Sequence, residues 1–168
     1  MLELLAMAAF AGLLVYAASS DVARLIIPNW VSIAMVALFI AFALLTGAPL
    51  ADVGMHLLFA AAILAVGFFL FAANIIGGGD AKLFAAASAW TGFAAFAPFI
   101  FWTAVAGGVM ALTLLAARQL VKQAETNPPF VNRLLKGEDG IPYGVAIMAG
   151  GFMAAPSIPF LSTSLTLP

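Results

Sequence analysis

Long apolar runs separated by short polar or glycine-containing breaks dominate this sequence. The first three runs cover residues 4–19, 30–46 and 53–73. Each is close to the roughly 20 apolar residues that a helix needs to cross the hydrocarbon core of a bilayer. Charged, proline and glycine residues follow each run, at Asp21, at residues 47–49 and at residues 77–79. The pattern therefore predicts three membrane-spanning helices in the first half of the chain.

The second half continues the pattern with one long polar interruption. Residues 83–117 carry no charge and are too long for a single crossing. A break at Thr91–Gly92 and Pro98 predicts a short fourth span and a fifth from about Phe99. The polar segment 118–140 then precedes a sixth apolar run at 141–155 and a tail rich in proline and serine. We predict one domain over residues 1–168, an all-α polytopic membrane bundle of about six transmembrane helices.

Composition supports a membrane protein. Hydrophobic residues make up 65% of the chain and charged residues 8%, whereas a soluble domain carries about 25% charged residues. A chain of 168 residues has too little interior to hide so much apolar surface from water. The net charge of −1 argues against a nucleic-acid partner. With no cysteine and one histidine, His56, we expect no metal site and no cofactor.

The basic residues predict an orientation, because cytoplasmic loops are enriched in lysine and arginine. With six spans, all basic residues fall on one side: Arg24, Lys82, Arg118, Lys122, Arg133 and Lys136. The opposite side holds Glu3, Asp52 and both chain ends. We therefore expect both termini outside and three segments in the cytoplasm. Glu3 and the absence of a basic residue before the first run favour a retained span over a cleaved signal peptide.

Two aspartates stand at span ends on the predicted cytoplasmic side. Asp21 opens Asp-Val-Ala-Arg-Leu-Ile-Ile-Pro-Asn, and Asp80 closes Gly-Gly-Gly-Asp before Ala-Lys. Carboxylates at this depth are costly and commonly face a water-filled cavity or a partner. Two neighbouring carboxylates hold one proton between them, because like charges resist ionising together. The ionised one can accept a proton from water while the neutral one polarises a peptide carbonyl, which permits peptide-bond hydrolysis.

Each of these residues also has a structural interpretation. Asp21 could pair with Arg24 or cap a short helix, and Asp80 could be the N-cap of the fourth span. Asp52 fits a helix cap, and His56 fits a structural role in an apolar helix. The same carboxylates would also suit proton or cation sites of an ion-coupled transporter. A non-catalytic assembly subunit is a further alternative, so these residues alone do not decide the reaction.

Three strings in order make the chain resemble the type IV prepilin peptidases, which are intramembrane aspartic proteases. The first is an Asp followed by Ile-Pro-Asn, at Asp21 and residues 27–29. The second is Gly-x-Gly-Asp at residues 77–80, and the third is Ile-Pro-Tyr-Gly-Val-Ala-Ile at residues 141–147. The resemblance implies the fold of the Gly-x-Gly-Asp membrane proteases, with Asp21 and Asp80 as the catalytic pair. It also implies loop or substrate-groove positions at Gly77, Gly79, Pro142 and Tyr143. Lys82 either tunes the ionisation of Asp80 or serves as an interface cation.

The resemblance also implies a substrate. Larger members carry a cytoplasmic domain with paired Cys-x-x-Cys motifs between the first two spans, and they N-methylate the new terminus. Here that connection is residues 20–29 and contains no cysteine, so the chain is similar to the peptidase-only form of tight-adherence (Flp) pilus systems. The implied activity is cleavage of the leader of type IV or Flp prepilins, or of pseudopilin precursors, at the cytoplasmic face of the inner membrane. The implied partners are the precursor, the lipid bilayer and the pilus assembly machinery.

Overall fold

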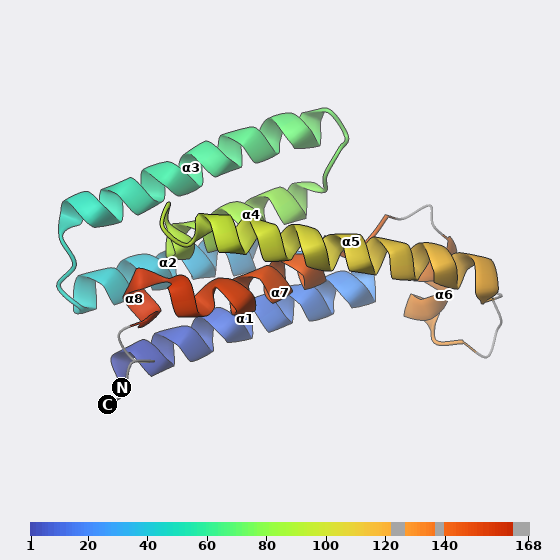
Figure 1. Ribbon diagram of the computed structural model, residues 1–168, viewed down its shortest axis with the longest axis horizontal. Helices are drawn as coiled ribbons and strands as arrows, with labels where there is room; N and C mark the ends of the chain where they lie inside the picture. Colours follow the sequence, from blue (N-terminus) through green and yellow to red (C-terminus); the bar gives the residue numbers. More distant parts are fainter. Residues whose placement is uncertain (122–126, 137–139, 163–168) are drawn as a thin grey trace.

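The computed structural model describes residues 1–121, 127–136 and 140–162; Lys122 and the tail at 163–168 lie outside this part of the chain. All regular structure within it is helical, which confirms the predicted all-α class. The elements are α1 (Leu2–Arg24), α2 (Asn29–Leu45), α3 (Leu50–Ala72), α4 (Gly78–Thr91), α5 (Phe96–Leu120), α6 (Pro129–Lys136), α7 (Tyr143–Ala154), the 3₁₀ turn η1 (Ala155–Ser157) and α8 (Pro159–Ser162). Figure 1 shows the long helices lying side by side.

Three of the described helices, α1, α3 and α5, are long and apolar enough to cross a membrane. Helix α2 is apolar but has 17 residues, and α4 and α7 have 14 and 12. Length and composition thus support three of the roughly six predicted spans. The other three predicted runs are also helices, but shorter ones.

The long helices α3 and α5 contact the bundle through narrow seams. The three buried residues of α3 recur every seven positions, at Val53, Ala60 and Gly67. Those of α5 recur every four, at Phe99, Thr103 and Gly107. Sixteen of the remaining positions of these two helices expose large apolar side chains, a surface that would associate in water. Lipid tails are as apolar as these side chains, so a bilayer solvates this surface.

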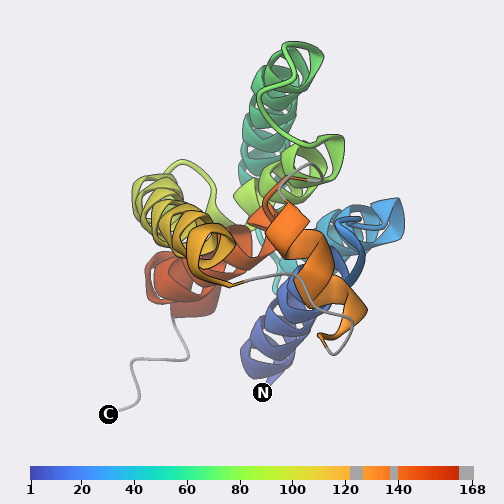
Figure 2. The same ribbon diagram turned by 90° about the vertical axis from the view of Figure 1, so that its right-hand side faces the viewer.

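Helix α4 forms the centre of the bundle. Nine of its 14 residues are buried, and it packs against α2, α3 and α7. Trp90 is fully buried near its end and donates an indole N–H to the Met35 carbonyl oxygen at 3.0 Å. Its ring contacts those of Phe10 and Phe39, with centroids 5.1 and 5.8 Å away. Figure 2, which looks along the bundle, shows α3 standing apart from the other helices with α4 at its base.

Helix α1 continues past Asp21, where the sequence pattern predicted that the first span would end. The helix can continue because its polar side chains find partners there. The Ser19 hydroxyl donates to the Val15 carbonyl at 2.7 Å, and the Asp21 carboxylate accepts from the Gly144 N–H at 2.7 Å. The helix ends at Leu25, whose φ of 54° places it in the left-handed region.

The predicted break after Thr91 is confirmed, but the fifth helix begins earlier than expected. Gly92, with a φ of 53°, turns the chain, and α5 starts at Phe96. Pro98 therefore lies within the first helical turn. Proline is tolerated there because the backbone N–H groups of a first turn have no acceptor within the helix. The predicted polar segment, 118–140, contains the end of α5 and the short helix α6.

The charged residues of the described chain separate to opposite ends of the bundle. All five described basic residues lie where α1 ends and α4 begins, a region that we call the basic end: Arg24, Lys82, Arg118, Arg133 and Lys136. Glu3 and Asp52 lie in the first turns of α1 and α3, at the other end. Helix α6 is held at the basic end because Arg133 donates to the Ala23 carbonyl at 2.7 Å.

Replacing Gly150 with Ala is expected to destabilise the bundle. A Cβ at this position of α7 would lie 2.9 Å from the Phe99 carbonyl oxygen and from the Thr103 nitrogen of α5. The two helices would have to separate, at a cost of about 1–3 kcal/mol. The thermal unfolding midpoint of the purified protein in detergent should therefore fall.

Gly108→Ala is the matched control for this substitution. Nothing lies within 4 Å of a Cβ at Gly108, and Ala is the better helix former by up to about 1 kcal/mol. Its unfolding midpoint should stay unchanged or rise. Equal midpoints for the two variants would contradict the close approach of α7 to α5.

Candidate active site

The two aspartates singled out in the sequence line one cavity at the basic end of the bundle. This cavity has a volume of about 270 Å³ and lies between the link from α1 to α2 and the start of α4. Its lining combines two carboxylates, glycine backbone and apolar side chains: Asp21, Leu25, Ile26, Ile27, Asn29, Gly77, Gly78, Gly79 and Asp80. We call it the aspartate cavity.

Asp21 projects from the last turns of α1 and is only 5% exposed. Its Oδ2 accepts a hydrogen bond of 2.7 Å from the backbone N–H of Gly144. Gly144 is the second residue of α7, and the free N–H groups of a helix N-terminus favour an anion there. The structure therefore gives Asp21 a backbone partner from a distant helix, in place of the ion pair with Arg24 that the sequence left open.

Asp80 is the third residue of α4 and is half-buried. Its carboxylate accepts a hydrogen bond from the backbone N–H of Gly77, the N-cap residue of the same helix. A side chain that reaches back from the third position to the N-cap is one half of a capping box. The structural interpretation that Asp80 is the N-cap of the fourth span is therefore wrong, because Gly77 is the N-cap. It also lies close enough to Asp21 for the two charges to interact.

Each carboxylate therefore sits at the N-terminus of a short helix, next to a glycine whose missing side chain makes room for it. A Cβ on Gly77 would lie 2.7 Å from Asp80 Oδ2, and a Cβ on Gly144 would lie 2.9 Å from Asp21 Oδ2. No residue from 77 to 79 has a positive φ. The glycines of this string are therefore needed here for space and not for an unusual backbone conformation.

From the sequence we named Gly144 only as a member of the string Ile-Pro-Tyr-Gly and predicted no function for it. Its position directly after Pro142 and Tyr143 was the available signal. Gly79 has a similar packing role, since a Cβ there would lie 3.2 Å from the Cβ of Ile27. That contact joins the start of α4 to the link between α1 and α2.

The other predicted positions lie around the aspartate cavity. Tyr143 and Asp80 together line a second cavity, of about 410 Å³, between α3, α4, α5 and α7. Pro142 is buried as the N-cap of α7. The ammonium group of Lys82 donates to Asn29 Oδ1 at 3.0 Å. Sequence reasoning gave Asn29 no separate role, although it stands in the Ile-Pro-Asn string.

Two of the remaining candidates lie far from this cavity. Asp52 is in the first turn of α3 but is not the predicted cap, because the N-cap residue is Pro49. The His56 Nδ1 lies 2.7 Å from the Ala89 carbonyl oxygen, and its ring stacks on Phe39 with centroids 5.3 Å apart. Both belong to the end of the bundle opposite the aspartates.

The arrangement is suited to acid–base chemistry with water. Two carboxylates in one small cavity can share a proton, and such a pair can activate water against a carbonyl group. Within residues 1–121, 127–136 and 140–162, no three acidic or histidine side chains gather in a way that would hold a metal ion.

Comparison with known proteins identifies the family. A sequence model of the type IV leader peptidase family matches residues 8–112. The match covers more than half of the chain and includes both aspartates, while Gly144 and the string around it lie beyond it. No curated protein and no solved structure matches the chain. The chain therefore belongs to the type IV leader peptidase family, whose members are aspartic-type prepilin leader peptidases of the membrane.

Proposed function

We propose that this protein is a membrane-embedded endopeptidase that cleaves the leader peptide of type IV or Flp prepilins, or of prepilin-like proteins, with Asp21 and Asp80 as its catalytic pair. One observation carries the proposal. Two carboxylates from helices far apart in the sequence line one cavity, and each accepts a hydrogen bond from the backbone of a helix N-terminus. Family membership supports the same reaction class.

In the proposed mechanism, one carboxylate of the pair is ionised and the other carries the shared proton. The ionised carboxylate accepts a proton from water as the water oxygen bonds to the scissile carbonyl carbon. The protonated carboxyl donates a hydrogen bond to the carbonyl oxygen, where negative charge develops. The carbon–nitrogen bond then breaks, and the leaving amine takes up a proton from the pair. Neither a metal nor a covalent intermediate takes part.

We further propose that α1, α2, α3, α4, α5 and α7 all cross the inner membrane, with the basic end in the cytoplasm. The gathering of the described basic residues at that end supports this orientation. Helix α4 has 14 residues, which corresponds to about 21 Å, less than the roughly 30 Å of a hydrocarbon core. A short helix is acceptable at this position because α4 is surrounded by protein and not by lipid.

This orientation suits a prepilin precursor as substrate. Such a precursor has a polar leader in the cytoplasm and an apolar helix in the bilayer, so its scissile bond reaches the membrane at the level of the basic end. Four residues, 25–28, link α1 to α2, which leaves no room there for the cysteine-rich domain of the bifunctional members. We therefore propose peptidase activity without N-methylation, in association with the pilus assembly machinery.

The remaining predicted positions receive supporting roles in this proposal. Gly77 gives the Asp80 carboxylate space and a hydrogen-bond donor, and Gly79 allows the start of α4 to approach the link between α1 and α2. Pro142 and Tyr143 begin α7 and so position Gly144 against Asp21. Lys82 is bound to Asn29, which lines the aspartate cavity together with Asp80, and any tuning of Asp80 by Lys82 would act from there.

Asp21→Asn and Asp80→Asn should each abolish cleavage of a co-expressed prepilin from the same locus. Losing either carboxylate removes the proton exchange with water, a loss of roughly 10² to 10⁴-fold in rate. Asn keeps an oxygen that can accept the Gly144 or Gly77 N–H, so the fold should persist. The ratio of precursor to mature pilin, read on a blot, measures the effect.

Asp52→Asn is the control for these two substitutions. Asp52 lies at the opposite end of the bundle, so its variant should process the precursor at the native rate. Normal processing by either Asp21→Asn or Asp80→Asn would refute the catalytic assignment.

Gly144→Ala should lower the cleavage rate while the protein still folds. The added Cβ would lie 2.9 Å from Asp21 Oδ2, so the carboxylate has to shift. Displacing a catalytic group by about 1 Å can cost up to roughly a hundredfold in rate. Gly108→Ala, which adds a methyl group in open space, should cleave the precursor normally, and equal rates for the two variants would refute the positioning role of Gly144.

Single cysteines can test the orientation, because the native chain has none. Leu50 and Ile75 are 75% and 67% exposed; Leu50 begins α3, and Ile75 lies three residues after its other end. In spheroplasts, a membrane-impermeant maleimide should label Leu50→Cys directly and Ile75→Cys only after the membrane is permeabilised. The reverse pattern would place the basic end outside.

A further inference from the structure

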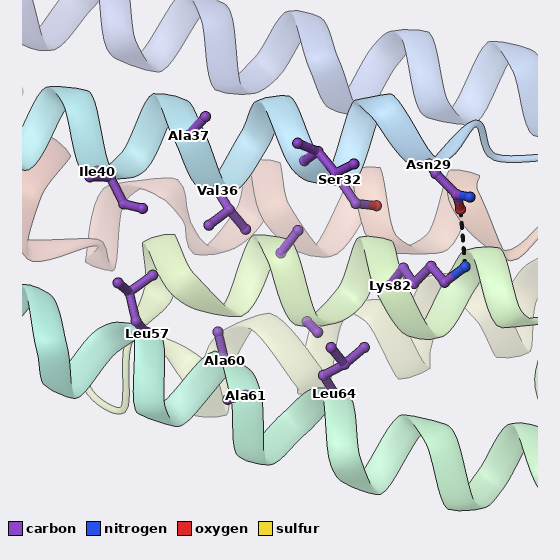
Figure 3. A pocket seen from close by; sticks show the side chains of 13 residues that line it. Asn29, Ser32, Val36, Ala37, Ile40, Leu57, Ala60, Ala61, Leu64 and Lys82 are labelled. Carbon is purple, nitrogen blue, oxygen red and sulfur yellow. Dashed lines mark hydrogen bonds between the residues drawn. The ribbon is translucent and has the colours of Figure 1, made fainter.

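A groove of about 690 Å³ runs along the bundle between α2 and α3, with α4 as its floor. In Figure 3 it extends from Asn29 and Lys82 at one end to Ile40 and Leu57 at the other. Apart from its polar end, its lining is almost entirely aliphatic: Ser32, Ile33, Val36, Ala37, Ile40, Leu57, Ala60, Ala61, Leu64, Ala85 and Ala86. We call it the α2–α3 groove.

The polar end of this groove adjoins the aspartate cavity. Asn29 lines both the groove and the cavity. Its side-chain oxygen accepts the hydrogen bond from Lys82 that joins α2 to α4. The surface thus changes along its length, from carboxylates, through one amide and one ammonium group, to hydrocarbon. A chain lying along it would need a polar segment at the aspartates and an apolar segment beyond them.

The floor and walls of the groove permit close approach by a helix. Alanines make up half of the apolar lining, at positions 37, 60, 61, 85 and 86, and small residues allow helix backbones to pack closely in membranes. From Asn29 to Ile40, α2 offers a wall of about 16 Å, or roughly three helical turns. The second cavity beside Asp80 is smaller, at about 410 Å³, and its walls include Phe84, Phe96 and Tyr143, so it offers less room for a helix.

Ser32 adds an independent indication that the groove receives a partner. It lines the groove one turn from Asn29, and its hydroxyl is buried. Within the described residues that hydroxyl has no hydrogen-bond partner. A buried polar group without a partner costs about 1–3 kcal/mol, and a polar atom of a bound chain at this level would remove that cost.

We propose that the α2–α3 groove binds the apolar helix of the precursor that follows the scissile bond. This inference rests on the proposed peptidase function and adds the substrate-binding surface to it. The polar leader then lies over the aspartate cavity, and the scissile bond enters it beside Asn29. The first three turns of the precursor helix pack on the alanines of α2, α3 and α4. Binding along this groove selects precursors in which an apolar helix directly follows the leader.

Filling the groove tests this inference, with an adjacent residue as the control. Ala61 and Ala62 are both exposed on α3, but only Ala61 lines the groove. Ala61→Phe should lower the rate of cleavage of the co-expressed prepilin by about tenfold or more, through a higher KM and not a lower kcat. Ala62→Phe should cleave within about twofold of the native rate. Equal cleavage by the two variants would overturn the groove assignment.

Disulfide cross-linking provides a second measurement that does not depend on a bulky substitution. The Asp80→Asn variant is expected to leave the precursor uncleaved. Because the peptidase has no cysteine, a single thiol can be placed at any chosen position. With one cysteine in the second turn of the precursor helix, mild oxidation should give a peptidase–precursor adduct with Ala61→Cys but not with Ala62→Cys. An adduct with Ile100→Cys instead would place the helix in the second cavity and overturn the inference. A disulfide-linked peptidase dimer from Ala61→Cys in place of the adduct would also overturn it, because a second copy would then occupy the groove.

The native chain in the same experiment separates the two proposals. If the native protein leaves the precursor intact, the peptidase function itself is wrong. If the native protein cleaves it, but Ala61→Phe cleaves equally well and Ala61→Cys forms no adduct, only the groove assignment is wrong.

Discussion

The hydrogen bond from the Gly144 N–H to the Asp21 carboxylate spans 123 residues of sequence and joins α1 to α7. It solves the main energetic problem of this chain, a carboxylate that is almost fully buried in an apolar bundle. A buried charge without hydrogen bonds is strongly destabilising, so α7 has to begin beside Asp21. The same contact aims the carboxylate into the aspartate cavity. One interaction therefore both permits the buried acid and orients it.

Glycine at the helix crossings makes that contact possible. Gly144 leaves space for the carboxylate, and Gly150 and Gly151 bring α7 against α5 and α1, where any side chain would meet Phe99 or Leu14. Without a hydrophobic driving force between helices in lipid, such close packing is a main source of their association. The helices around the site thus pack closely at these glycines, against backbone at Gly150 and against side chains at Gly144 and Gly151. The outer faces of α3 and α5 contribute little to this and are free to contact lipid.

The position of α3 connects the site to its proposed substrate. Because α3 contacts the bundle along one narrow seam on α4, it leaves a groove on the side of α2 and a smaller cavity on the side of α5. Both open beside the start of α4, where Asp80 lies. A rigid, buried α4 would thereby carry a catalytic carboxylate at its first turn and the floor of a binding groove along its length. Peptide hydrolysis and helix binding would then depend on the same short helix.

The amino-acid sequence by itself determined the helical class, the apolar runs and the separation of charges, because hydrophobic length and charge are local properties. It also marked both aspartates, since carboxylates are conspicuous beside apolar spans. It did not predict that α1 would continue past Asp21 or that Pro98 would lie inside α5, because both depend on which backbone groups find partners. The tertiary structure alone decided that Gly144 binds Asp21, that Lys82 binds Asn29 and that α3 stands apart from α2. These contacts depend on how each helix is rotated and where it crosses its neighbours. The two hydrogen bonds join residues more than 50 positions apart in the sequence, so they form only when the bundle packs.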